Sequence, residues 1–126
     1  MSHFHAVVWM DHQEAHVLHF DAESFEAQRV KARSHHPRHH AGDAQGQTLF
    51  QEGILKALEG AQEVLVVGPG SAHDEFTAWA KRHHPDAARK LMANEKADHP
   101  TDPQLVALAR KHFVKLDRMA GTPTPT

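Results

Sequence analysis

Histidines gather in one short segment of this sequence, and their side chains are of the type that binds transition metals. Four of them lie within six residues, separated only by a proline and an arginine: His35, His36, His39 and His40. Imidazole nitrogens suit Zn²⁺, Ni²⁺ and Cu²⁺, but a dedicated zinc site needs ligands held in tetrahedral geometry by a rigid scaffold. The segment also lacks the H-E-x-x-H spacing that places two histidines on one face of a helix. We therefore expect adventitious binding of zinc or nickel here and no dedicated cofactor.

The same part of the chain is basic. Between residues 27 and 42 there are four basic side chains and no acidic one, at Arg29, Lys31, Arg33 and Arg38. Protonation of the four neighbouring histidines would double that positive charge. Such a segment can neutralise RNA phosphates, with an affinity that falls as salt rises. A solvated segment without a partner is the simpler interpretation, and these residues alone do not decide between the two.

A glycine-containing turn, Gly68-Pro69-Gly70-Ser71, is a candidate anion site because backbone N–H groups at the start of a helix can hold a phosphate. The turn lacks the lysine of a P-loop and the third glycine of a dinucleotide-binding motif. A tight connection from a strand to a helix accounts for the same residues. In that interpretation Ser71 caps the helix and Asp74 completes the capping signature, and we favour it.

Each candidate site for hydrolytic chemistry lacks some of the residues that the chemistry needs. Neither Ser34 nor Ser71 lies in the G-x-S-x-G turn that exposes a nucleophilic serine. Asp11 resembles the first carboxylate of a two-metal nuclease, but the clustered acids that hold the metals are missing from the sequence pattern. His99 is expected to fix the turn before the last helix rather than to act as a base. The sequence therefore favours binding over catalysis, while leaving catalysis open.

Composition and length are those of one soluble domain. The chain has 126 residues, 14 Lys and Arg, 16 Asp and Glu, 14 His and no Cys, which gives a net charge of −2 with neutral histidines. No apolar run approaches the ~20 residues that a membrane helix needs, and no secretory signal precedes the first strand. We expect a cytoplasmic protein with a single domain over residues 1–119 and a disordered tail over residues 120–126.

A mixed sheet is expected to position these candidates. Apolar and β-branched residues predict three strands, at residues 3–10, 15–20 and 25–31, with Met10 opposite Ala15 across a tight turn. Both faces of the first two strands are largely apolar, which predicts that helices cover the sheet on both sides.

The second half of the chain alternates helices and strands, after a segment at residues 32–46 that has no large apolar side chain and is expected to be a mobile loop. The predicted elements are, in chain order, a helix from Gln47, a strand at Glu63–Val67, a helix after Ser71, a short helix from Ala87, an edge strand at Lys90–Glu95 and a helix after Thr101. His83 falls on the apolar stripe of its helix beside Trp79, so it is expected at the edge of the core. Thr101 and Gln104 form a capping box. The order β-β-β-α-β-α-β-α predicts an α/β fold with a mixed five-stranded sheet.

Three segments of the sequence resemble the middle domain of archaeal and eukaryotic class-1 peptide-chain release factors, and more closely the stand-alone bacterial homologues called translational machinery proteins. They are AVVWMDHQEAHVLHF (6–20), VLVVGPGSAHDEF (64–76) and HPDAARKLMANEKADHPTDPQLVALARKHF (84–113). The resemblance covers most of the chain and implies a ribonuclease-H-like domain with three layers, α/β/α.

In those release factors, a Gly-Gly-Gln motif lies between the third strand and the first helix, and its glutamine helps water attack the ester of peptidyl-tRNA. Here Gln45-Gly46-Gln47 lies in the corresponding place, so Gly46 and Gln47 match the motif and Gln45 departs from it. A glutamine does not supply the positive-φ freedom of the missing glycine. The resemblance makes Gln47 the one candidate catalytic residue, and it adds Gly46 and Gln47 to the candidate RNA contacts.

These observations predict a small translation-associated factor that binds the ribosome or a structured RNA, such as tRNA or rRNA, without chemistry of its own. The candidate RNA-binding residues are Arg29, Lys31, Arg33, Arg38, Gly46 and Gln47. One alternative is a peptidyl-tRNA ester hydrolase that uses Gln47, and another is a histidine-rich metal-binding protein. We do not expect stop-codon decoding, because the codon-reading and partner-binding domains of the release factors have no counterpart here. Homodimerisation is left open.

Overall fold

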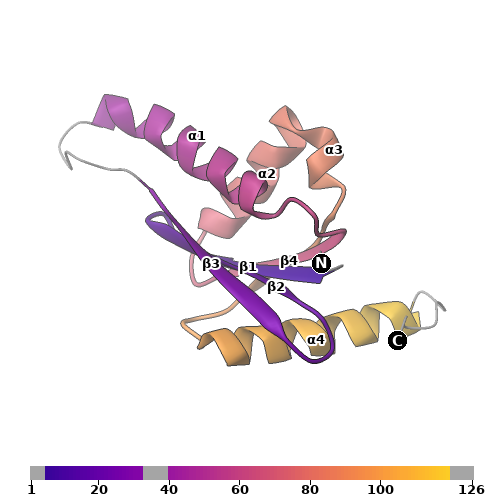
Figure 1. Cartoon of the computed structure of the whole chain (residues 1–126). Coiled ribbons are helices and arrows are strands. Elements are labelled where there is room, and N and C mark those ends of the chain that lie inside the picture. Colours follow the sequence, from indigo (N-terminus) through magenta and orange to yellow (C-terminus); the bar gives the residue numbers. More distant parts are fainter. Residues whose placement is uncertain (1–4, 33–39, 120–126) are drawn as a thin grey trace.

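The computed structural model describes residues 5–32 and 40–119, which form a five-stranded sheet with helices on both faces (Figure 1). The elements are, in chain order, β1 (His5–Met10), β2 (Glu14–Phe20), β3 (Phe25–Lys31), α1 (His40–Ala57), β4 (Glu63–Gly68), α2 (Ala72–His83), α3 (Pro85–Ala88), β5 (Leu91–Lys96) and α4 (Asp102–Met119). The strands lie in the order β3-β2-β1-β4-β5. This is the predicted α/β fold. None of the helices in the described ranges is long and apolar enough to cross a membrane.

Strand pairing is mixed, as the sequence predicts. The first three strands form an antiparallel meander, in which Met10 lies opposite Ala15 as expected. β1 also pairs with β4, and β4 with β5, in parallel. Because parallel neighbours need a crossover connection, α1 joins the meander to β4, and α2 with α3 joins β4 to β5. The central strand β1 therefore has an antiparallel partner on one side and a parallel partner on the other.

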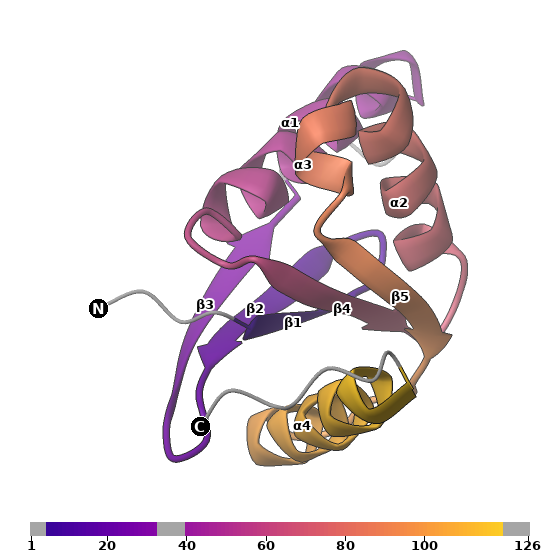
Figure 2. The same cartoon turned by 90° about the vertical axis from the view of Figure 1, so that its right-hand side faces the viewer.

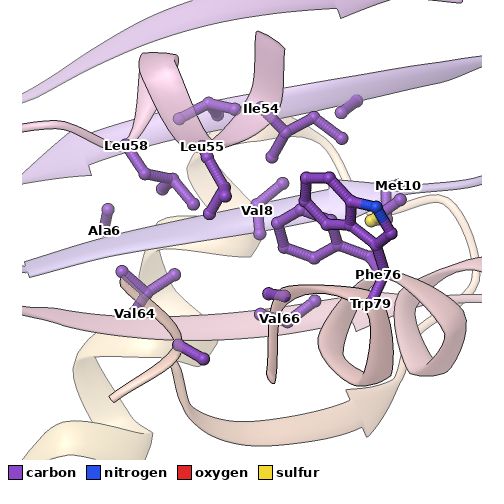
Figure 3. Packing of buried hydrophobic residues seen from close by; sticks show 14 of the residues in the cluster. Ala6, Val8, Met10, Ile54, Leu55, Leu58, Val64, Val66, Phe76 and Trp79 are labelled. Atoms are coloured by element: carbon purple, nitrogen blue, oxygen red, sulfur yellow. The ribbon is translucent and has the colours of Figure 1, made fainter. Parts of the chain in front are cut away.

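The sheet has an apolar core on each face. On one face, Ala6, Val8 and Met10 of β1 pack with residues of β4 beneath α1 and α2 (Figure 3). On the other face, Val7 and Trp9 pack beneath α4. Figure 2 shows the three layers, with α1, α2 and α3 on one side of the sheet and α4 alone on the other. The alternation of side chains along β1 thus supplies both cores, which is why both faces of that strand are apolar in sequence.

The loop predicted at residues 32–46 is too long, because α1 begins at His40 and residues 40–46 are helical. The absence of large apolar side chains argues against burial, but it does not exclude a helix. Ala41, Ala44 and Gln45 favour helix whereas Gly42 and Gly46 do not. The turns around the buried Phe50 and Ile54 provide the nucleus from which the helix extends towards its N-terminus. The rest of the expected loop, residues 33–39, and the expected tail, residues 120–126, lie outside the described residues, so their mobility stays a prediction.

Candidate nucleic-acid interface

Two of the predicted RNA contacts, Arg29 and Lys31, lie on the edge strand β3. Arg29 lies opposite His16 of β2, and Lys31 opposite Glu14. Residues 16, 18 and 20 of β2 face the α4 side of the sheet, since Leu18 and Phe20 belong to the core beneath α4. Arg29 and Lys31 therefore share that face. Both side chains are exposed, so the structure leaves two cations side by side at one edge of the sheet.

Acidic groups moderate the charge of this edge. Glu14 is the cross-strand neighbour of Lys31, and the carboxylate of Asp102, at the start of α4, lies 3.5 Å from Nδ1 of His16. Cross-strand charges of opposite sign attract. The described part of β3 is thus a modestly basic surface, which agrees with the small net charge of the chain.

Most of the other predicted contacts and metal ligands are not in the described part of the structure. Arg33, His35, His36, Arg38 and His39 lie outside the described residues. His40 is the first residue of α1, and its side chain also lies outside the described part. Within residues 5–32 and 40–119, no group of three or more histidine and carboxylate side chains could hold a metal ion. The metal site therefore stays a prediction.

The location expected for the Gly-Gln pair is wrong. Gly46 and Gln47 lie inside α1 and are both half-buried, not in a loop ahead of that helix. Among the described residues Gly60 is the glycine with a positive φ, at 95°. The pair lies inside the helix because the helix propagates from the turns around Phe50 and Ile54 through the preceding residues.

The turn from Gly68 to Ser71 connects a strand to a helix, as predicted, but Ser71 does not cap α2. Its backbone angles are helical, with φ −100° and ψ −7°, so its hydroxyl is not placed to accept from the N–H groups of the first turn. The Ser71 Oγ instead donates to Oε2 of Glu75 at 2.8 Å, and His12 Nε2 lies 3.1 Å from Oε1 of the same carboxylate.

The hydrogen bond from Ser71, together with the contact from His12, holds the pKa of the Glu75 carboxyl below its usual range. Asp74 and Glu75 both lie in the first turn of α2. Two carboxylates at this position repel an anion. The turn is therefore a structural connection and not a phosphate site.

A buried histidine that the sequence reasoning missed lies just after this turn. His73 is 2% exposed, its Nδ1 donates to Oδ1 of Asn94 in β5, and Nδ2 of Asn94 donates to Oδ1 of Asp74 at 2.6 Å. The Nε2 atom of His73 is buried without a hydrogen-bond partner, so a solute cannot reach it. Although an imidazole oriented by an amide resembles a catalytic arrangement, this network joins α2 to β5. The polar Asn94 within a half-buried edge strand is the sequence signal that could have revealed it.

Two other predicted site residues form turns. Oδ1 of Asp11 accepts hydrogen bonds from the backbone N–H groups of Gln13 and Glu14, both at 2.8 Å, so Asp11 shapes the β1–β2 turn. The ring of His99 packs against Trp9, with their centroids 4.9 Å apart. His99 thus lies at the connection that leads into α4, as expected.

The capping box predicted for the last helix is confirmed. The backbone N–H of Thr101 donates to Oε1 of Gln104 at 2.9 Å, and the backbone N–H of Gln104 donates to Oγ1 of Thr101 at 3.3 Å.

The comparisons with known proteins rest on structure. No family model and no curated protein matches the sequence. Pelota from Archaeoglobus fulgidus is similar with a TM-score of 0.64 and 15% identity, over 93% of this chain and 35% of that one. The archaeal translation termination factor aRF1 gives 0.61 and 13%, over 93% of this chain and 41% of that one.

Dom34 of S. cerevisiae, a translation termination-like factor involved in RNA quality control pathways, gives 0.52 and 12%, over 91% of this chain and 38% of that one. The chain therefore spans about a third to two fifths of these proteins. Its fold is similar to the ribonuclease-H-like middle domain of Pelota and aRF1.

Proposed function

We propose that this protein is a translation-associated factor that binds the ribosome or its structured RNAs and acts by binding, without hydrolysing an ester. The observation that carries the proposal is the fold, which is shared over nine tenths of this chain with domains of translation termination and termination-like factors. Fold likeness alone does not fix a function, so the surface must offer a means of contacting RNA.

Arg29 and Lys31 are the described residues that best fit this role. They are exposed on one face of an edge strand, and Arg33 and Arg38 follow in the sequence. Lys and Arg bind RNA chiefly through phosphates, so that each contact adds to the salt dependence of binding. With a net charge of −2, the protein should bind modestly and lose its affinity as salt rises.

The position of Gln47 supports binding over catalysis. A residue within a helix has its backbone N–H and C=O committed to that helix, and this one is also half-buried. A side chain held in this way is not presented to a substrate by a flexible loop.

Ribosome co-sedimentation at low salt tests the proposal. We expect the wild-type protein to pellet with 70S ribosomes, and Arg29→Gln/Lys31→Gln to bind about tenfold more weakly, with the slope of log affinity against log salt reduced by about two. The matched control is Lys56→Gln/Lys96→Gln, which removes two exposed cations from α1 and β5 that lie in none of the basic stretches and should bind like the wild type.

Two outcomes would count against the proposal. If the wild-type protein pellets no more than a neutral control protein, ribosome binding is wrong. If the protein releases the acyl group from ribosome-bound peptidyl-tRNA, and Gln47→Ala abolishes that release, then the non-catalytic part is wrong.

A further inference from the structure

Basic residues are concentrated in three stretches of the chain, one of which carries Arg29 and Lys31. Of the 14 Lys and Arg and 16 Asp and Glu residues, residues 27–42 hold four basic and no acidic side chains. Residues 80–90 hold four basic and one acidic side chain. Residues 110–118, in α4, also hold four basic and one acidic side chain, and Arg110 there donates to the backbone carbonyls of Asp21 and Ser24. The rest of the chain holds two basic and fourteen acidic side chains, so each of the three stretches is distinctive.

The second stretch forms a corner where α2 ends and α3 begins, and α3 packs beside the last turn of α2 (Figure 2). We name its four exposed side chains the α2–α3 corner: Lys81, Arg82, His83 and Arg89. The corner lies on the opposite side of the sheet from α4, whereas the exposed face of β3 that carries Arg29 and Lys31 is the one turned towards α4. The two basic surfaces are thus separate.

The cations of the corner are available to a partner. Within the described residues, neither Lys81 nor Arg82 forms an ion pair. Arg89 contacts Asp86 at 3.6 Å, with both side chains more than four fifths exposed, and such a pair is screened by water and salt. Lys90, by contrast, has a structural contact, because its Nζ donates to the carbonyl of Leu58 at 2.9 Å. Partial burial also lowers the pKa of Lys90.

An aromatic surface accompanies these cations. The exposed ring of His83 packs on the buried ring of Trp79, with centroids 5.8 Å apart, and the centroid of the His84 ring lies 5.1 Å from that of Trp79. His84 is paired with Glu52 of α1 at 2.8 Å, which leaves His83 as the outward ring. Cations beside an exposed, supported ring are the combination that binds unpaired nucleotides, through phosphate contacts and base stacking. An acidic peptide would use the cations but not the ring.

We propose that the α2–α3 corner is a second RNA-binding surface, at which Lys81, Arg82 and Arg89 contact phosphates and His83 stacks on an unpaired base. This inference rests on the proposed function and adds to it where the RNA is held. Unpaired loops and ends of structured RNA are the segments whose bases are free to stack on protein rings.

Binding of fluorescein-labelled bulk bacterial tRNA, measured by fluorescence anisotropy at several salt concentrations, tests the corner. Lys81→Gln/Arg82→Gln should weaken binding about tenfold at low salt and reduce the salt slope by about two. Lys81→Arg/Arg82→Lys preserves the charge and should bind like the wild type. His83→Ala should weaken binding by about fivefold or more with an unchanged salt slope, because stacking releases no counterions.

The matched control is again Lys56→Gln/Lys96→Gln, which makes the same change in net charge at residues outside the corner. If the control and the corner variant lose equal affinity, only net charge matters and the inference is overturned. The inference is also overturned, with the proposed function intact, if tRNA binding depends on Arg29 and Lys31 but not on the corner. If the wild-type protein binds neither tRNA nor ribosomes, both proposals fail. Competition by poly-glutamate as effective as that by unlabelled tRNA would assign the corner to an acidic protein instead.

Discussion

The two edge strands of the sheet, β3 and β5, use polar side chains in different ways. On β3, every side chain is exposed except Val30, which is half-buried and packs with the core beneath α1. On β5, Asn94 bonds to His73 in α2 on one face of the sheet. Glu95 lies on the other face, with Oε2 3.1 Å from Nδ1 of His112 in α4. The polar side chains of β5 thus connect both helical layers, whereas those of β3 face solvent.

The comparison shows that polar side chains in an edge strand can have two roles: they can face solvent, or they can bond to a neighbouring helix. The sequences FEAQRVK and LMANEK are both polar, and natural edge strands carry charges that discourage pairing with other sheets. α1 packs on Val30 of β3, so what separates these two edges is whether the polar side chains themselves bond to a helix, as Asn94 and Glu95 of β5 do. We therefore expect substitutions near β5 to change stability, and substitutions on β3 to change binding.

The largest expected effect is at Gly68, whose carbonyl accepts from the backbone N–H of Ala97 just after β5. A Cβ at Gly68 would overlap the carbonyl oxygen of Met10 and lie 2.8 Å from Cδ2 of His73. Since backbone and a buried ring cannot both move aside, Gly68→Ala should lower the free energy of unfolding by about 3 kcal/mol. Urea denaturation measures this. Gly70→Ala is the control, because nothing lies within 4 Å of its Cβ, and a similar loss there would contradict the explanation.

A smaller effect is expected at Asn94, the residue that connects β5 to α2. Asn94→Ala removes the acceptor for Nδ1 of His73 and leaves a buried donor unpaired, which should cost about 2 kcal/mol. The matched change on the other edge is Gln28→Ala, at an exposed position of β3, which should stay within about 0.5 kcal/mol of the wild type. Equal losses at the two positions in chemical denaturation would remove the distinction between the edges.

The smallest expected effect is the change of stability with pH that Lys90 causes. Burial lowers the pKa of Lys90, the residue before β5, and the charge of Glu59 partly opposes this. Because the unfolded chain keeps the ammonium protonated to a higher pH than the folded protein does, folding releases a proton between the two pKa values, and stability rises with pH there.

The stability of the wild type relative to Lys90→Met should therefore increase as pH approaches ~10.4, the ordinary value for lysine. The increase should be about 0.5 kcal/mol or less, since the side chain remains partly solvated. Urea denaturation from pH 8 to 10.5 measures it. Lys31→Met on β3 should show no comparable trend, and a decrease with pH for Lys90 would contradict the burial argument.

The sequence predicted the sheet well because burial leaves a strong signal in strands. The apolar residues on both faces of β1 and β2, with the Asp11 turn between them, are sufficient to predict the register and the two-sided covering. The capping box at Thr101 and Gln104 was predictable for a similar reason, since both its hydrogen bonds are local.

The start of α1 was not predictable from burial, because the residues before Gln47 include no large apolar side chain. Along α2, the helical period placed His83 at the edge of the core, yet His83 is exposed and His73 is buried. The last three residues of α2 are exposed, whereas His73 in its first turn packs against Gly68. Periodicity gives the face of a helix but not where along its length the helix contacts the sheet. The close packing of Met10 and His73 against Gly68 and the hydrogen bond from His73 to Asn94 join segments that are distant in the sequence. Such tertiary contacts leave no local pattern in the sequence.

The central position of β1 has a consequence for how the chain is made. Its pairing with β2 is local and available once about twenty residues have emerged, whereas its pairing with β4 requires residues 63–67. Hairpins form in ~1–10 μs, but synthesis proceeds at ~5–20 residues per second. The edge of β1 that will receive β4 is therefore open for roughly several seconds in every nascent chain. Its sequence, HAVVWM, is of the kind that pairs with other strands. The slower residues 63–67 follow the first hairpin, the longer this edge stays open to pairing with another chain.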